Sequence, residues 1–304
     1  MGVVSLQLAS WTTAEINAVC REPYGVYERA LREHYGAYFE ANPGLAGTHP
    51  VKAKDLAAAL PPGADFLEEY LPEKLRHLHH LSGRSSQIVA LGLLGLAWRR
   101  DPSLRWLEAA LALPGLLQSP APGVAFETEL DSMLLSESPN VSTIDFLVED
   151  DGAVVCVEAK FGEDGMGRCS CSAGATAVAD CSAKVLSRPL YWETARDVFF
   201  LPERSHGSPC PIASSYQAIR NSAAARALAN GRRAVFVLVY DQRNPYFHSV
   251  GAWPGWPTLL TSTLKDAERL DLLTFRAVSW QELLPQLPLE ESALTWAREK
   301  HALI

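Results

Sequence analysis

The stretch VSTIDFLVEDDGAVVCVEAKF, residues 141–161, decides the fold that we expect for this chain. Its two halves, 141–148 and 154–161, are rich in the β-branched and aromatic residues that favour strands. The Asp151-Gly152 pair between them is typical of a type I′ hairpin turn. With these two residues in the loop, Asp150 faces Ala153, and counting back along both strands places Asp145 opposite Glu158.

Side chains alternate along a strand, so Asp145, Glu158 and Lys160 are expected on one face of this hairpin. Two directly opposed carboxylates repel each other, which favours a cation between them. Oxygen ligands suit Mg²⁺ or Mn²⁺, and the ammonium group of Lys160 could orient or help deprotonate a metal-bound water. A second interpretation is also open, because half-exposed antiparallel strands often carry ordinary surface charges.

The order Asp145, twelve residues, then Glu158-Ala159-Lys160 resembles the D…ExK signature of the PD-(D/E)XK nuclease superfamily. A downstream helix containing residues 216–221 and the apolar strand after it agree with this resemblance. Ser85-Ser86-Gln87 is similar to a motif in a bacterial group of restriction-endonuclease-like proteins. The chain departs from the superfamily's name, since Ile144 replaces the proline before Asp145. The resemblance covers roughly residues 80–285.

This resemblance implies an α/β fold with a mixed sheet and the αβββαβ core of restriction endonucleases. We expect an N-terminal helical region over residues 1–80 and a nuclease-like domain over 81–304, with a cysteine-containing insertion at 162–212. The implied activity is Mg²⁺-dependent hydrolysis of phosphodiester bonds, with DNA as the partner. Asp145, Glu158 and the backbone carbonyl of Ala159 would hold the metal, and Lys160 would position the nucleophile.

Three further residues are candidates for the site. Residues 124–130 are expected to form a strand with Glu127 and Glu129 on one face, and an inward-facing Glu127 would supply the third carboxylate that the superfamily often draws from an earlier element. The resemblance places Gln217, on a helix over residues 214–229, at the active site or on a backbone phosphate; a surface position is equally open. Gln87 could lie near the site or satisfy buried backbone groups.

A basic segment precedes the Ser-Ser-Gln motif and contains Lys74, Arg76, His77, His79, His80 and Arg84. It could contact phosphates, or it could form a solvated helix face.

Four cysteines in the insertion, Cys169, Cys171, Cys181 and Cys210, have a spacing that could bind Zn²⁺ or an iron–sulfur cluster. Incidental reduced thiols are the competing interpretation. Cys20 and Cys156 are not expected to take part.

The composition sets outer limits. A chain of 304 residues that is 48% hydrophobic can bury a sizeable core. No apolar run is long enough for a membrane span and no signal peptide is evident, so we expect a cytoplasmic protein. The net charge of −8 requires any basic surface for nucleic acid to be local.

Two other functional classes stay open at this point. One is a catalytically inactive nucleic-acid-binding module of the same fold. The other is a structural or adaptor protein clamped by Zn²⁺ or an iron–sulfur cluster on the cysteine segment.

Overall fold

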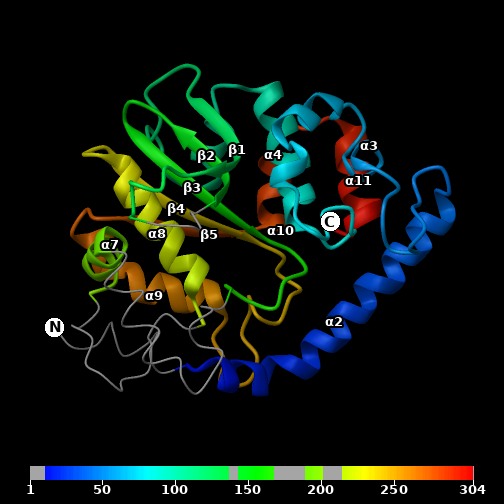
Figure 1. The fold of residues 1–304 in the computed structure, drawn as a ribbon, viewed down its shortest axis with the longest axis horizontal. Coiled ribbons are helices and arrows are strands. Elements are labelled where there is room, and N and C mark those ends of the chain that lie inside the picture. The colour runs from blue at the N-terminus through cyan, green and yellow to red at the C-terminus, as the bar shows by residue number, and fades with distance from the viewer. Residues whose placement is uncertain (1–10, 137–142, 168–188, 201–213, 304) are drawn as a thin grey trace.

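A mixed five-stranded sheet forms the centre of the protein in a computed structural model, which describes residues 11–136, 143–167, 189–200 and 214–303. The strands lie in the order β1 (Gly123–Glu129), β2 (Thr143–Glu149), β3 (Ala153–Lys160), β4 (Arg233–Tyr240) and β5 (Thr274–Ser279). Strands β1, β2 and β3 pair in antiparallel fashion, whereas β3, β4 and β5 are parallel. This arrangement confirms the predicted mixed α/β fold class (Figure 1).

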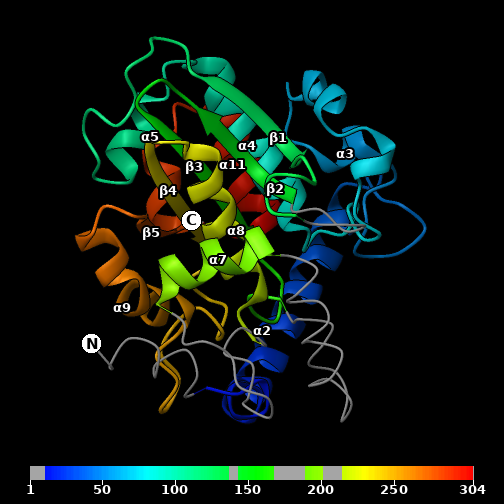
Figure 2. The ribbon, with the colours of Figure 1, turned by 60° about the vertical axis from the view of Figure 1, so that its left-hand side comes forward.

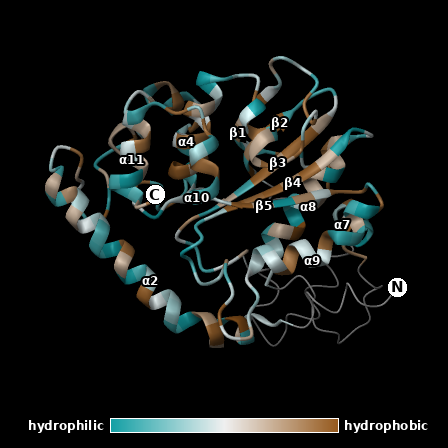
Figure 3. Cartoon of the chain, turned by 180° about the vertical axis from the view of Figure 1, so that it is seen from behind, coloured by the Kyte–Doolittle hydropathy of each residue, from teal (hydrophilic) through white to brown (hydrophobic). Residues whose placement is uncertain are grey.

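Helices cover both faces of the sheet (Figures 1 and 2). One face carries α4 (Ser86–Arg100), α10 (Trp280–Leu283) and α11 (Glu291–His301), and the other carries α7 (Pro189–Phe199), α8 (Tyr216–Ala229) and α9 (Trp256–Arg269). In β3, Val155 and Val157 pack toward the first face, while Val154 and Cys156 pack toward the second. Every residue of β3 is buried, as expected for a central strand between two helical layers. Figure 3 shows β3 and β4 as the most hydrophobic strands of the sheet.

The β2–β3 hairpin has the predicted register but a different turn. Pairing runs from Phe146↔Val157 to Glu149↔Val154, and Asp150 donates its backbone N–H to the carbonyl of Ala153 at 2.9 Å. Neither Asp151 nor Gly152 has a positive φ, so the type I′ assignment was wrong. The carboxylate of Asp150 instead accepts backbone N–H groups from Gln118, Ser119 and Gly152, and these three bonds shape the turn. A Cβ on Gly152 would lie 2.8 Å from the Gln118 side chain, so close approach accounts for the glycine.

The N-terminal region contains one long helix, α2 (Thr13–Ala41), where the residue spacing predicts two, one from residue 12 or 13 to 20 and one over 25–38. Thr12 followed by Glu15 predicts a capping box, which is present. The helix continues through Pro23 and Gly25 because a buried stripe along it, from Ile16 to Phe39, packs against the rest of the molecule. Short elements follow it along the chain: α3 (Leu56–Ala59), η1 (Asp65–Tyr70), η2 (Glu73–Leu75) and α5 (Arg105–Ala110).

The C-terminal elements agree with the sequence pattern except at one point. The Asn230-Gly231 pair predicts the end of α8, and both residues have positive φ there. Ser279 predicts the start of a single last helix, but it caps only the short α10, and η4 (Leu284–Gln286) separates α10 from α11. Within the described part of the chain, no helix has the length and apolar character required to cross a membrane.

Candidate active site

Three acidic residues lie in one row across three neighbouring strands. The β1–β2 register skips a single position between Phe126↔Phe146 and Thr128↔Ile144, and Glu127 and Asp145 occupy it. The β2–β3 ladder ends at Phe146↔Val157, one step before Asp145 and Glu158. The register therefore places Asp145 opposite Glu158, as predicted, although the two residues are not a hydrogen-bonded backbone pair.

The backbone turns out of the regular strand pattern at Glu127. Its φ of 46° is in the left-handed region, which a strand residue rarely adopts. Phe126 and Glu127 are consequently both buried, whereas Glu129 is exposed. The prediction that Glu127 and Glu129 share a face was wrong, and Glu127 alone turns inward.

The acids are held by hydrogen bonds from neutral groups and by one ammonium group. Asp145 is partly exposed, and its Oδ2 accepts the backbone N–H of Ala159 at 2.7 Å. The buried carboxylate of Glu158 accepts one hydrogen bond from Lys160 Nζ and one from Asn221 Nδ2. Lys160 is only 4% exposed, so its ion pair with Glu158 is largely shielded from water.

Burial and mutual repulsion perturb the acids strongly. Burial raises the pKa of Asp145 well above its usual range, and the charges of Glu158 and Glu127 add to this effect. Burial, followed by the charge of Glu158, raises the pKa of Glu127 to about 7. Burial alone would lower the pKa of Lys160, but the carboxylates near it outweigh burial and raise the pKa above its ordinary value. Lys160 is thus an ammonium group at neutral pH.

Gln87 joins the Ser-Ser-Gln motif to the acidic row. Its side chain donates to the Leu75 carbonyl at 3.0 Å, accepts the His77 backbone N–H at 3.1 Å, and forms a hydrogen bond with the Glu127 carboxylate. Gln87 therefore satisfies buried backbone groups, and it also contacts a site residue. These are the two roles that the sequence left open for it. His77 Nε2 lies 3.9 Å from Glu127 Oε2.

The sequence analysis did not identify two residues next to the row. On α8, Asn221 contacts Glu158, whereas the side chain of Gln217 packs against Gly167. Gln217 and Asn221 are one turn apart, so the polar stripe on this helix was a signal for both residues. Glu163 follows Lys160 by three residues, and its carboxylate accepts the Phe161 backbone N–H at 2.6 Å and the Ser86 hydroxyl. No motif in the sequence indicated Glu163.

The basic segment before α4 folds as a 3₁₀ turn and a loop, so the prediction of a solvated helix face was wrong. Part of this loop lines a pocket of about 600 Å³ together with residues from α2 and from the chain after β3. Its charged or titratable lining includes Arg32, His49, Lys52, His77, His79, Arg84 and Glu163. Because His77 and Glu163 also adjoin the acidic row, the pocket opens beside it.

Cys20 and Cys156 are free thiols in the buried core. The four cysteines of the insertion, Cys169, Cys171, Cys181 and Cys210, lie outside the described residues.

The mixed five-stranded sheet and its covering helices are consistent with a restriction-endonuclease-like fold. Residues 47–300 match the family described as "Restriction Endonuclease associating with ARP", and the chain belongs to this family. Searches of curated proteins and of solved structures returned no significant match.

Proposed function

We propose that the chain is a metal-dependent nuclease of the PD-(D/E)XK type that hydrolyses phosphodiester bonds in DNA. The observation that carries this proposal is the row of Glu127, Asp145 and Glu158 on adjacent strands, with Lys160 beside it. Membership of a restriction endonuclease family supports it. Burying several carboxylates near a single ammonium group is costly unless a further cation joins them.

The donor set fits a hard divalent cation. Asp145, Glu158 and the backbone carbonyl of Ala159 would hold Mg²⁺ or Mn²⁺, and Glu127 would supply a third carboxylate. Among the described residues, no three histidine, cysteine or acidic side chains are gathered closely enough to form a ready metal site. Mg²⁺ commonly takes only one or two carboxylates and completes its shell with water and substrate phosphate, so two ligands from the chain suffice. When bound, the metal would lower the pKa of a water molecule and offset charge developing on the phosphate.

The ion pair with Glu158 keeps Lys160 as an ammonium group, which favours one of the two roles expected for it. An ammonium group donates hydrogen bonds and cannot accept a proton. Lys160 would therefore orient the attacking water and stabilise negative charge on the phosphate, and it would not act as the base. Asn221 donates to Glu158 and would hold that carboxylate in place for the metal.

The basic pocket would bind the strand that leads into the site. Lys52, which belongs to none of the ion pairs among described residues, lines the pocket with Arg32 and Arg84. Glu28 pairs with both arginines, so the lining keeps cationic character. A local basic surface of this kind is what a chain with a net charge of −8 needs to approach phosphates.

Cleavage of linear, nicked and single-stranded DNA with Mg²⁺ or Mn²⁺ tests the activity. Wild-type protein is expected to cleave at least one substrate, to stop when EDTA is added, and to recover with Mg²⁺. Asp145→Asn and Lys160→Met should each lose cleavage by at least ~10²-fold, which is typical when a group that stabilises the transition state is removed. Glu129→Gln is the matched control, because Glu129 is exposed on the same strand as Glu127. Mg²⁺-dependent cleavage by both site variants would refute the proposal.

DNA binding by Asp145→Asn, measured as fluorescence anisotropy over a range of salt concentrations, tests the pocket. Adding Lys52→Ala should weaken binding and reduce the salt dependence by about one phosphate contact. Adding Lys54→Ala instead should change neither, because Lys54 is exposed two residues away and does not line the pocket. Equal effects of the two lysines would contradict a role for the pocket. Binding by wild-type protein with no cleavage under any condition would instead identify an inactive binding module.

A further inference from the structure

The backbone that carries Lys160 continues beyond the sheet without a neighbouring strand. Pairing of β3 with β4 ends at Lys160↔Tyr240, so the carbonyl groups from Lys160 onward need other donors. Buried carbonyl groups almost always find a partner, and the source of that partner determines what holds the segment.

Side-chain and backbone donors distant in the sequence hold the first two of these carbonyls. The Lys160 carbonyl accepts the Trp280 indole N–H at 3.2 Å and the Asp241 backbone N–H at 3.1 Å. The Phe161 carbonyl accepts the Asn244 amide at 3.1 Å and lies 2.8 Å from the Tyr27 hydroxyl oxygen, whose single proton it shares with the Asp241 carboxylate.

The next two carbonyls are held in the same way. Tyr24 donates its hydroxyl to the Gly162 carbonyl at 2.7 Å, and Asn244 Nδ2 donates to the Glu163 carbonyl at 2.8 Å. Four consecutive carbonyls thus bind donors from α2, from α10 and from the chain after β4. We call the five donor residues the carbonyl clamp: Tyr24, Tyr27, Asp241, Asn244 and Trp280.

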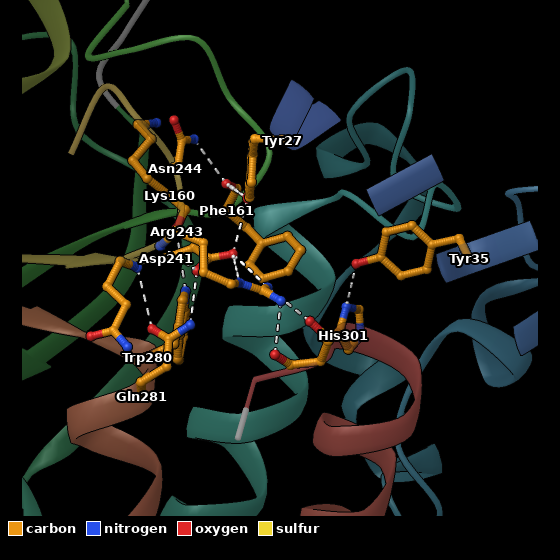
Figure 4. A network of polar contacts seen from close by, with 12 residues as sticks. Tyr27, Tyr35, Lys160, Phe161, Asp241, Arg243, Asn244, Trp280, Gln281 and His301 are labelled. Carbon is orange, nitrogen blue, oxygen red and sulfur yellow. Dashed lines mark hydrogen bonds and ion pairs between the residues drawn. The ribbon is translucent and has the colours of Figure 1, made fainter. Parts of the chain in front are cut away.

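The clamp is itself fixed by an ion pair between Asp241 and the partly exposed Arg243 (Figure 4). Asp241 is completely buried, and its carboxylate accepts bonds from Arg243, Gln281 and the Tyr27 hydroxyl. Arg243 also donates to the carbonyls of His301 and Ala302 at the end of α11. The N-terminal helix, the C-terminal helix and the end of β3 therefore meet in one network.

We propose that the carbonyl clamp positions the Lys160 ammonium and the Glu163 carboxylate beside the acidic row. Lys160 is the last residue of β3 that pairs with β4, and the residues after it have no neighbouring strand to hold them. Glu163 reaches back to the Phe161 N–H, so displacement of Phe161 would displace that carboxylate as well. The clamp residues are positioning residues, because they hold the backbone and leave the side chains of Lys160 and Glu163 directed to the site. This inference rests on the proposed nuclease function.

Tyrosine-to-phenylalanine variants on α2 separate positioning from mere stability. The double variant Tyr24→Phe/Tyr27→Phe removes both α2 hydroxyls from the clamp. The matched control is Tyr38→Phe, on the same helix, whose ring packs on Phe39 and whose hydroxyl donates to none of the four carbonyls.

Steady-state DNA cleavage and hydrogen exchange are measured for both variants and for wild-type protein. The clamp variant is expected to lower kcat by about tenfold with little change in KM, since small misplacement of a catalytic group is costly. Amide exchange over residues 161–163 should accelerate in the clamp variant and not in the control. Equal kcat values in the two variants, a loss confined to KM, or unchanged exchange over residues 161–163 would overturn the proposal. Absence of cleavage by wild-type protein would refute the nuclease function itself.

Discussion

Lys300 is a buried cation outside the site, and its removal should stabilise the protein in acid and at neutral pH. It is 1% exposed on α11, where its ammonium donates to the Ala59 carbonyl and lies 5.1 Å from the centre of the Trp296 ring. Burial lowers the pKa of Lys300 from 10.5 to about 7. The folded protein therefore favours the neutral amine more than the unfolded chain does.

The sign and size of the effect follow from proton linkage. Below pH 7 both states carry the proton, and the folded state bears the whole cost of the buried charge, roughly 5 kcal/mol from the pKa difference. The contacts with the Trp296 and Phe39 rings offset about 1–2 kcal/mol of this cost. Between pH 7 and 10.5 only the folded state releases the proton, so the contribution of Lys300 to stability rises with pH.

Lys300→Met keeps the length of the side chain and removes the charge. Its loss of the bond to Ala59 costs about 1 kcal/mol at every pH. In urea unfolding the variant should exceed wild-type stability by about 2 kcal/mol at pH 6, and this advantage should disappear by about pH 10. Lys54→Met, at an exposed lysine, controls for the change of net charge. Parallel stability curves for Lys300→Met and wild type across this range would refute the reasoning.

Three other predictions concern the site, the hairpin turn and the thiols. Millimolar Mg²⁺ should raise the melting temperature of wild-type protein by about 2–4 °C and leave Asp145→Asn/Glu158→Gln unchanged; equal shifts would contradict the metal site. Asp150→Ala should cost about 2–4 kcal/mol in urea unfolding, because three backbone N–H groups lose their acceptor. Asp150→Asn keeps an acceptor oxygen and should cost less, and equal losses would argue against this role. Burial raises the pKa of Cys20 to about 11 and that of Cys156 further, so neither thiol should be alkylated by iodoacetamide at pH 8 before unfolding. Peptide mass spectrometry would detect native labelling, which would contradict this account.

The register of the central hairpin could be predicted because it depends on local pattern alone. Alternating residue types fix which side chains share a face, and a two-residue loop fixes the count across the turn. The turn type could not be predicted in this way. The Asp150 carboxylate binds Gln118 and Ser119, which lie on a preceding loop that the local pattern does not bring to the turn.

The parts of the site that sequence reasoning missed depend on tertiary contacts. The sequence predicts Gln217 on the helix that became α8, but only packing against the sheet brings Asn221 rather than Gln217 to Glu158. The positive φ of Glu127 has no signature in a strand sequence. Glu163 and the clamp could not be predicted either, because they depend on contacts between residues far apart in the sequence. Tyr27 and the Phe161 carbonyl, for example, are 134 residues apart.

The charge balance of the site explains why these tertiary contacts are needed. The carboxyl groups of Glu127, Asp145, Glu158 and Glu163 lie around a single ammonium group, that of Lys160. Neutral donors on Gln87, Asn221, Ser86 and two backbone amides satisfy these acids without cancelling their charge. Burial and the mutual repulsion of these acids raise the pKa of Asp145 and of Glu127, and a bound divalent cation would relieve this repulsion. Without that cation, the site depends on the backbone after β3, which the carbonyl clamp holds from α2, from α10 and from the chain after β4.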